Sequence, residues 1–187
     1  PYYNKPTQEG LYQHFSTVAK ETDLPIMLYN VPSRTAINME PGTVARLSSI
    51  KNIVGIKEAS GSLVQVSEII DSCGPDFSVS SGEDALTWPI LAIGGKGVIS
   101  VTANLVPGKF AKLCQAAREG DMETAKALHY ELLKLNDVMF IETNPIPVKA
   151  ALALMGRIEN EFRPPLCPPT EEHLSQLKTT LGVYALA

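Results

Sequence analysis

Four short apolar segments alternate with segments of helical periodicity in the first half of the chain. The pattern predicts strands at residues 26–29, 53–57, 77–80 and 98–101. Strict alternation of strand and helix is typical of parallel sheets with right-handed crossovers, and the near-continuous apolar strands indicate burial on both faces. Two architectures satisfy this α/β pattern: a doubly wound sheet, and half of a (β/α)8 TIM barrel.

From about residue 120 the periodicity becomes helical throughout. The apolar spacing predicts three helices there, at about 125–139, 145–155 and 170–181. We therefore expect two domains. Residues 1–120 would form four βα units, and residues 121–187 a C-terminal helical domain.

The composition describes a globular protein, because 44% of the residues are hydrophobic and the net charge is −4. No run of Lys or Arg is longer than a pair, so nucleic-acid binding is not expected. No apolar segment reaches the length of a membrane span and the N-terminus lacks a signal-peptide layout, so we expect a cytoplasmic protein. The three cysteines and three histidines show no ligand spacing, and we expect neither a disulfide framework nor a metal.

Lys57 closes the second predicted strand, which is otherwise apolar. Because side chains alternate along a strand, Lys57 is expected on the same face as Ile53 and Gly55. Val54 and Ile56 are expected on the opposite face, against helices. If the first face lines a barrel, Lys57 lies inside it near the C-terminal mouth, where such barrels carry their catalytic residues, and Gly55 leaves space below it.

A lysine enclosed at that position is partly stripped of water, which favours the neutral amine that attacks carbonyl carbons. The alternative is a lysine that reaches solvent from the end of a strand. Tyr29 ends the preceding strand at the equivalent position, and its phenol could exchange protons with an imine on Lys57. Arg34 follows in the loop predicted at residues 30–35, where its guanidinium could bind a carboxylate. Taken singly, these two residues are better explained as a core tyrosine and a surface arginine.

Six segments of the sequence closely resemble the dihydrodipicolinate synthase family of pyruvate-dependent aldolases. They follow the order of the family over essentially the whole chain. The segments are PYYNKP (1–6), YNVPSRT (29–35), GIKEASG (55–61), SGED (81–84), GVISVTAN (97–104) and NPIPVK (144–149).

The resemblance implies a lyase that uses a lysine Schiff base and no cofactor. Lys57 would form an imine with pyruvate, and the derived enamine would add to L-aspartate-4-semialdehyde, in the first committed step of diaminopimelate and lysine biosynthesis. Tyr29 matches a proton-transfer tyrosine of the family. Tyr3 matches a tyrosine that reaches into the site of a partner subunit, which implies a homodimer within a tetramer.

The remaining matches concern binding. Arg34 matches the residue that holds the carboxylate of the semialdehyde, and Gly82 and Ile99 match positions that line the pyruvate pocket. Tyr2 matches one contact of the feedback effector lysine. The N-terminal third of the family, with the first four strands, is absent from this chain, which begins at Pro1 rather than Met. We therefore expect the chain to belong to a longer or processed protein.

Two other functions are compatible with the same residues. One is another pyruvate-dependent lyase of the superfamily, such as an N-acetylneuraminate lyase or a keto-deoxy-sugar aldolase, which would share the Tyr and Lys positions. The segment around Arg34 favours the synthase. The other is a catalytically incompetent fragment that serves only in packing or association.

Overall fold

The computed structural model describes residues 1–187 and divides into two compact units, Pro1–Ile99 and Ser100–Ala187. The predicted domain boundary after residue 120 stays a prediction.

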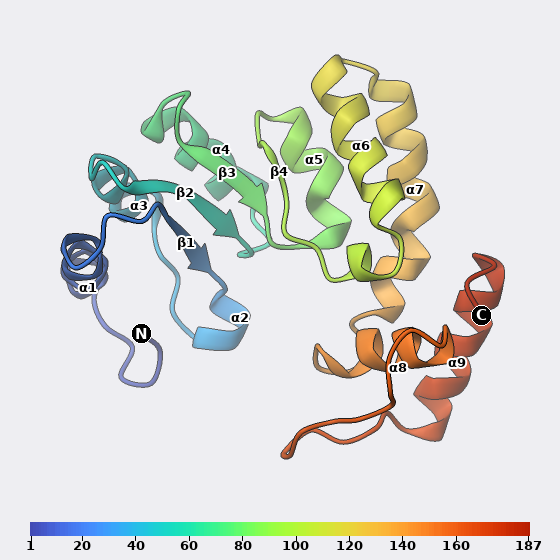
Figure 1. Cartoon of the computed structure of the whole chain (residues 1–187). Coiled ribbons are helices and arrows are strands. Elements are labelled where there is room, and N and C mark those ends of the chain that lie inside the picture. Colours follow the sequence, from blue (N-terminus) through green and yellow to red (C-terminus); the bar gives the residue numbers. More distant parts are fainter. The chain divides into compact units, whose positions relative to one another are not determined.

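The first unit is built on a parallel sheet of four strands that lie side by side in chain order (Figure 1). All four predicted strands are present, with small shifts at their ends. The fourth strand is shorter than predicted, because the chain leaves the sheet after Val98 instead of continuing to Val101. The strands are β1 (Ile26–Asn30), β2 (Ile53–Glu58), β3 (Ser78–Ser81) and β4 (Gly97–Val98).

Helices connect these strands as the alternating pattern predicts. They are α1 (Gln8–Lys20), α3 (Pro41–Ser48), α4 (Leu63–Cys73) and, after the 3-10 turn η1 (Asp84–Leu86), α5 (Thr87–Ala92). The predicted loop at residues 30–35 is wrong in part, because Pro32–Thr35 form the short helix α2. Pro32 supplies the fixed φ of a first helical residue, and Ala36 ends the turn in the left-handed region with φ 56°.

The helices cover only one face of the sheet. Leu28 and Ile56 are at most 1% exposed and join the core that α1, α3, α4 and α5 contribute. The residues next to Leu28 point the other way, since Met27 is 41% and Tyr29 44% exposed. A doubly wound sheet would carry helices on both faces, so the half-barrel prediction is confirmed.

A bulge at the start of β2 corrects the predicted side-chain alternation. Ile26 pairs with Ile53 and Met27 with Gly55, so Val54 is an extra residue without a partner on β1. As a result Ile53 joins the helix-side core, while Val54 is 40% exposed. The predicted faces of these two residues were therefore wrong, whereas Ile56 faces the helices as expected.

Gly55 has a different role from the one predicted. A Cβ atom there would stand 2.4 Å from the backbone oxygen of Ser78 on β3. The missing side chain allows β2 and β3 to approach each other closely, and does not leave open space below Lys57.

The second unit is helical. It contains the turn η2 (Thr102–Asn104) and helices α6 (Pro107–Glu119), α7 (Met122–Val138), α8 (Ile146–Leu154) and α9 (Glu171–Val183). The three predicted helices correspond to α7, α8 and α9, and α6 was not singled out from the sequence. Asp121 and Thr170 cap α7 and α9 by accepting N–H groups of the first turn.

No helix of the chain combines the length and apolarity that crossing a membrane requires. The cysteines Cys73, Cys114 and Cys167 are free thiols. The structure holds no group of three or more His, Cys, Asp or Glu side chains that could share a metal ion.

Candidate active site

The amine of Lys57 lies over the ring of Tyr29. Its Nζ atom is 4.1 Å from the ring centroid, and the two residues are register partners on β2 and β1. Lys57 is half-buried and Tyr29 is 44% exposed, so the pair lies on the open face of the sheet. The parallel pairing of β1 with β2 thus brings the predicted amine and phenol together at the carboxyl ends of adjacent strands.

Gly82 borders the same lysine. A Cβ atom on Gly82 would stand 3.1 Å from Cε of Lys57, so a glycine leaves room for the extended lysine side chain. The N–H of Gly82 donates to the backbone oxygen of Glu58 at 2.7 Å, which fixes the end of β3 to the end of β2. Ile99 follows β4, and its N–H donates to the oxygen of Ser81 at 2.9 Å.

Three further predicted residues are exposed. Arg34 lies on α2, directly after β1, and forms no salt bridge. Tyr2 is 67% and Tyr3 86% exposed, in a turn closed by the N–H of Lys5 and the oxygen of Tyr2 at 3.2 Å. The structure therefore brings Lys57, Tyr29 and Gly82 together, while the side chains of Tyr2 and Tyr3 extend into solvent.

A cavity of about 310 Å³, lined by both apolar and polar residues, borders Tyr29 beside α1. Its polar lining includes His14, and the N-terminal residue Pro1 also reaches it. The segment that carries Tyr2 and Tyr3 therefore begins at the cavity that Tyr29 lines. The apolar lining consists of Leu11, Phe15, Met27, Leu28, Val31, Ile37 and Met39.

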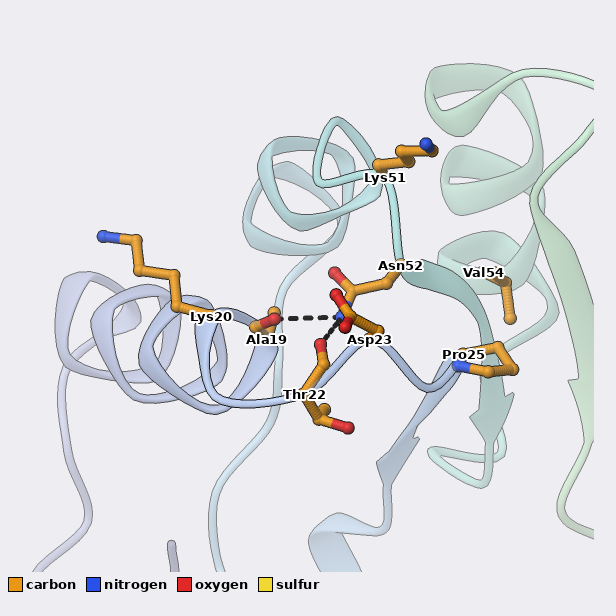
Figure 2. A pocket seen from close by; sticks show the side chains of 8 residues that line it. All are labelled: Ala19, Lys20, Thr22, Asp23, Pro25, Lys51, Asn52 and Val54. Atoms are coloured by element: carbon orange, nitrogen blue, oxygen red, sulfur yellow. Dashed lines mark hydrogen bonds between the residues drawn. The ribbon is translucent and has the colours of Figure 1, made fainter.

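A second cavity, of about 500 Å³, lies at the amino-terminal ends of β1 and β2, the end opposite to Lys57 (Figure 2). Asn52 lines this cavity and donates to the oxygens of Ala19 at 2.9 Å and Thr22 at 2.8 Å. Lys20 and Lys51 point away from Asn52 (Figure 2). Asn52 thus ties the end of α1 to the start of β2, and the lysines do not converge on a ligand.

Sequence reasoning missed a buried polar cluster behind Lys57. The carboxylate of Glu58 is 2% exposed and accepts from Asn30 Nδ2 at 3.2 and 3.0 Å, one bond to each oxygen. Asn38 and Gln65 extend the cluster toward α4. The available signal was a polar residue directly after each site residue: Asn30 follows Tyr29, and Glu58 follows Lys57.

Glu83, beside Gly82, carries the perturbed carboxyl group of this region. Burial raises the pKa of Glu83, and the negative charge of Glu58 raises it further. The backbone of Glu83 is held by the hydroxyl of Ser81, which donates to the Glu83 oxygen at 2.7 Å and accepts its N–H at 3.1 Å. The loop after β3 is therefore fixed on both sides of Glu83.

The fold and the site together define a class of protein. A lysine amine beside a phenol, at the carboxyl ends of barrel strands, is an arrangement suited to covalent imine chemistry on a carbonyl substrate. The sequence profile of the Dihydrodipicolinate synthetase family matches residues 1–183. The chain belongs to that family.

The similar proteins are consistent with this assignment. A 4-hydroxy-tetrahydrodipicolinate synthase of Nitratidesulfovibrio vulgaris is 57% identical over 187 residues, which is 100% of this chain and 64% of the relative. The crystal structure of dihydrodipicolinate synthase from Aquifex aeolicus superposes with a TM-score of 0.97 at 49% identity, over 100% of this chain and 64% of that one. The chloride-inhibited enzyme from Acinetobacter baumannii, complexed with pyruvate, gives a TM-score of 0.97 at 42% identity, with the same coverage. The chain spans about 64% of the length of these relatives.

Proposed function

We propose that this chain carries the imine-forming part of an enzyme that condenses pyruvate with L-aspartate-4-semialdehyde. The observation that carries the proposal is the Lys57 amine placed 4.1 Å from the centroid of the Tyr29 ring, with Gly82 against the lysine side chain. Family membership and the name of the Nitratidesulfovibrio relative support the same reaction.

The first half of the reaction follows from the amine. Lys57 Nζ attacks the keto carbon of pyruvate to give a carbinolamine, and loss of water gives the imine. The leaving hydroxide needs a proton and the nitrogen must lose one, and the Tyr29 hydroxyl on the neighbouring strand is the candidate group for both transfers. The pyruvate complex of the Acinetobacter enzyme supports pyruvate as the first substrate.

The second half needs a site for another carboxylate. Loss of a methyl proton converts the imine to an enamine, whose carbon attacks the aldehyde of the semialdehyde. The amine of that substrate then closes the ring on the imine carbon and releases Lys57. Arg34 is exposed and without a salt bridge at the end of β1, so its guanidinium is available for the semialdehyde carboxylate. We place Ile99 beside the pyruvate pocket with Gly82.

The assembly is part of the proposal. Tyr3 is 86% exposed, which suits a side chain that completes the site of a second subunit. We infer a homodimer that exchanges Tyr3, within a tetramer built of two such dimers, because closed symmetric oligomers are usual. Tyr2, beside it, is the proposed contact for a feedback effector. The free cysteines favour a reducing compartment, so we infer a cytoplasmic location.

We also retain the division of the chain into a barrel part, 1–120, and a helical domain, 121–187. On this division α6 is the helix that follows the last barrel strand. The alternating βα order through α6 supports the proposal.

Reductive trapping tests the first half-reaction. The chain is incubated with pyruvate and sodium borohydride, and the mass and the modified peptide are determined. One reduced pyruvate adduct on Lys57 is expected. Lys57→Arg keeps the charge but should give no adduct, because a guanidinium stays protonated and is a poor nucleophile. If the wild type forms no adduct, the hypothesis of a catalytically incompetent fragment is favoured. An adduct on another lysine would refute the role of Lys57.

The second substrate is tested in the complete enzyme. Hydrogen bonds to charged groups typically contribute about 1.5–3 kcal/mol, so Arg34→Ala should lower kcat/KM for the semialdehyde by roughly one to two powers of ten. Pyruvate trapping should persist in this variant. The sugar-acid lyase alternative is not favoured, because the similar proteins bear the synthase name. Cleavage of a six- or nine-carbon keto acid without semialdehyde condensation would reinstate it.

A further inference from the structure

The last residues of the two strands that carry Tyr29 and Lys57 form a hydrogen-bonded link next to the Lys57–Tyr29 contact. Asn30 is the last residue of β1 and Glu58 the last of β2, and they are register partners. Both are buried, at 3% and 2% exposure. Their backbones are joined as well, since the N–H of Ala59 donates to the oxygen of Asn30 at 2.9 Å.

Every hydrogen bond to the Glu58 carboxylate comes from a neutral donor. Oε1 accepts from Asn30 Nδ2 and from the N–H of Ser60 at 2.6 Å. Oε2 accepts from Asn30 Nδ2 and from Gln65 Nε2 at 3.4 Å. No salt bridge of the structure includes Glu58. A buried carboxylate without a cationic partner is costly to maintain, so its donors must be held in place to keep it satisfied.

Asn30 transmits this constraint to β1. Its Oδ1 accepts the N–H of Met39 at 2.9 Å, and its Nδ2 also donates to Asn38 Oδ1 at 2.8 Å. The side chain is therefore fixed in one orientation, with its amino group toward Glu58. Because Tyr29 precedes Asn30 and Lys57 precedes Glu58, the link fixes the backbone at both members of the site pair.

We propose that Glu58 is a positioning residue that holds the Lys57 amine over the Tyr29 ring by locking the ends of β1 and β2 together. This role goes beyond the proposed function and refers to the same site. Glu58 itself is buried on the helix side of the sheet, where it accepts from Gln65 of α4, so it acts through its neighbours. The backbone oxygen of Glu58 extends the lock to β3, because it accepts the N–H of Gly82.

The carboxylate cannot be replaced by its amide. Each Glu58 oxygen accepts hydrogen bonds from two donors. In Glu58→Gln the side-chain amino group replaces one of these oxygens, so in either orientation of the amide it would face donors and not acceptors. The ends of β1 and β2 should then separate, although the apolar core on the helix side is unchanged.

The contact can be measured without activity, because protons close above an aromatic ring experience its ring current, and the Lys57 amine lies 4.1 Å from the centroid of the Tyr29 ring. Lysine-labelled wild type is expected to show upfield-shifted Lys57 side-chain resonances and an NOE to the Tyr29 ring. In Glu58→Gln a displacement of the strand ends by about 1 Å would misplace the Lys57 amine relative to the Tyr29 ring. The upfield shift of Lys57 should then fall by at least about half, and the NOE should weaken.

Ile69→Ala is the matched control, because Ile69 is fully buried on α4 and belongs to the core behind the sheet but not to the polar link. The Ile69→Ala variant should keep the ring-current shift of Lys57, although it should lose at least as much thermal stability as Glu58→Gln. Should Glu58→Gln fail to fold, Asn30→Ser removes the two bonds across the carboxylate and is expected to give a smaller loss of the same signal. An unchanged shift in the folded Glu58 or Asn30 variant, or an equal loss in Ile69→Ala, would overturn the proposal.

Pyruvate trapping provides the second readout. The rate constant for trapping at saturating pyruvate should fall about ten- to a hundredfold in Glu58→Gln, while half-saturation should change less than about threefold, because a misplaced amine is slower but the pocket remains. If only the pyruvate concentration at half-saturation changed, and not the rate constant, the positioning role of Glu58 would be contradicted. If wild type traps no pyruvate, the proposed function fails for this chain, and the ring-current measurement still decides the role of Glu58.

Discussion

The two compact units use their apolar residues differently. In Pro1–Ile99 the sheet buries its helix side and leaves Met27, Tyr29 and Val54 about two-fifths exposed on the other side. In Ser100–Ala187 the central leucines, such as Leu132 and Leu135, are at most 1% exposed. A helix needs cover on one stripe, whereas a parallel strand needs it on both faces, so the sheet of the first unit is left with an open face.

The difference separates chemistry from support. All predicted site residues, from Tyr2 to Ile99, belong to the first unit. The second unit contributes caps and packing, such as Asp121 at the start of α7 and the contact of the Tyr184 hydroxyl with the backbone oxygen of Glu131. Substitutions around the site of the first unit should therefore change pyruvate trapping, whereas substitutions in the second unit should change stability alone.

Tyr29→Phe is expected to have the largest effect on the chemistry of the first unit. The ring remains, so the fold and the placement of Lys57 should persist, but the proton-transfer group is lost. Trapping of pyruvate should slow by roughly 10²–10⁴-fold, which is typical of lost acid–base assistance. The rate is measured by quenched borohydride trapping, with circular dichroism as the control for folding. An unchanged rate would remove Tyr29 from the mechanism.

Leu135→Ala examines the second unit alone. Leu135 is 0% exposed on α7, and removing such a side chain typically costs about 2–5 kcal/mol. The urea midpoint should fall accordingly, while trapping at Lys57 measured well below the transition should match wild type. Loss of trapping in the folded variant would show that the two units are coupled.

Gly55→Ala examines the close approach of two strands in the first unit. The new methyl would collide with the backbone oxygen of Ser78, 2.4 Å from the ideal Cβ position, so β2 and β3 must move apart. Overpacking of this kind typically costs about 1–3 kcal/mol. We expect a lower melting temperature together with slower trapping, because β2 carries Lys57. Gly42→Ala, on α3, is the control: an added Cβ meets nothing within 4 Å there, and alanine favours the helix over glycine, so the melting temperature should not fall and trapping should be unchanged.

The smallest expected effect concerns acid stability in the second unit. The His173 side chain, with the N–H of Thr170, holds the pKa of Glu142 below its usual value. A carboxyl with a lowered folded-state pKa stabilises the fold above its unfolded pKa, and this contribution disappears as the pH falls through the lower, folded value. Partly exposed pairs contribute only about 0.2–1 kcal/mol.

Glu142→Gln should therefore melt slightly below wild type at about pH 7, and the difference should vanish as the pH falls below the lowered pKa of Glu142. Thermal melts of both proteins over this range measure the effect. A difference in melting temperature that grows as the pH falls would contradict the lowered pKa of Glu142.

Much of the site could be predicted from single residues and their order. Lys57 and Tyr29 each close a predicted apolar strand, and parallel pairing of consecutive strands was enough to place them side by side. The bulge at Val54 was not predictable, because alternation in the sequence assumes an uninterrupted register. The short helix after β1 was also missed, since four residues are too few to show helical periodicity.

The sequence by itself determined the alternation of strands and helices, the change to helices in the second half, and the identity of the amine and the phenol. These features depend on local spacing and on residue type. Only the tertiary structure decided that Glu58 and Asn30 share a buried carboxylate link, that Gly55 serves the contact with β3, and that Gly82 borders the lysine. Each of these is a contact between separate strands, and its distance is set by register and packing, which no local pattern contains.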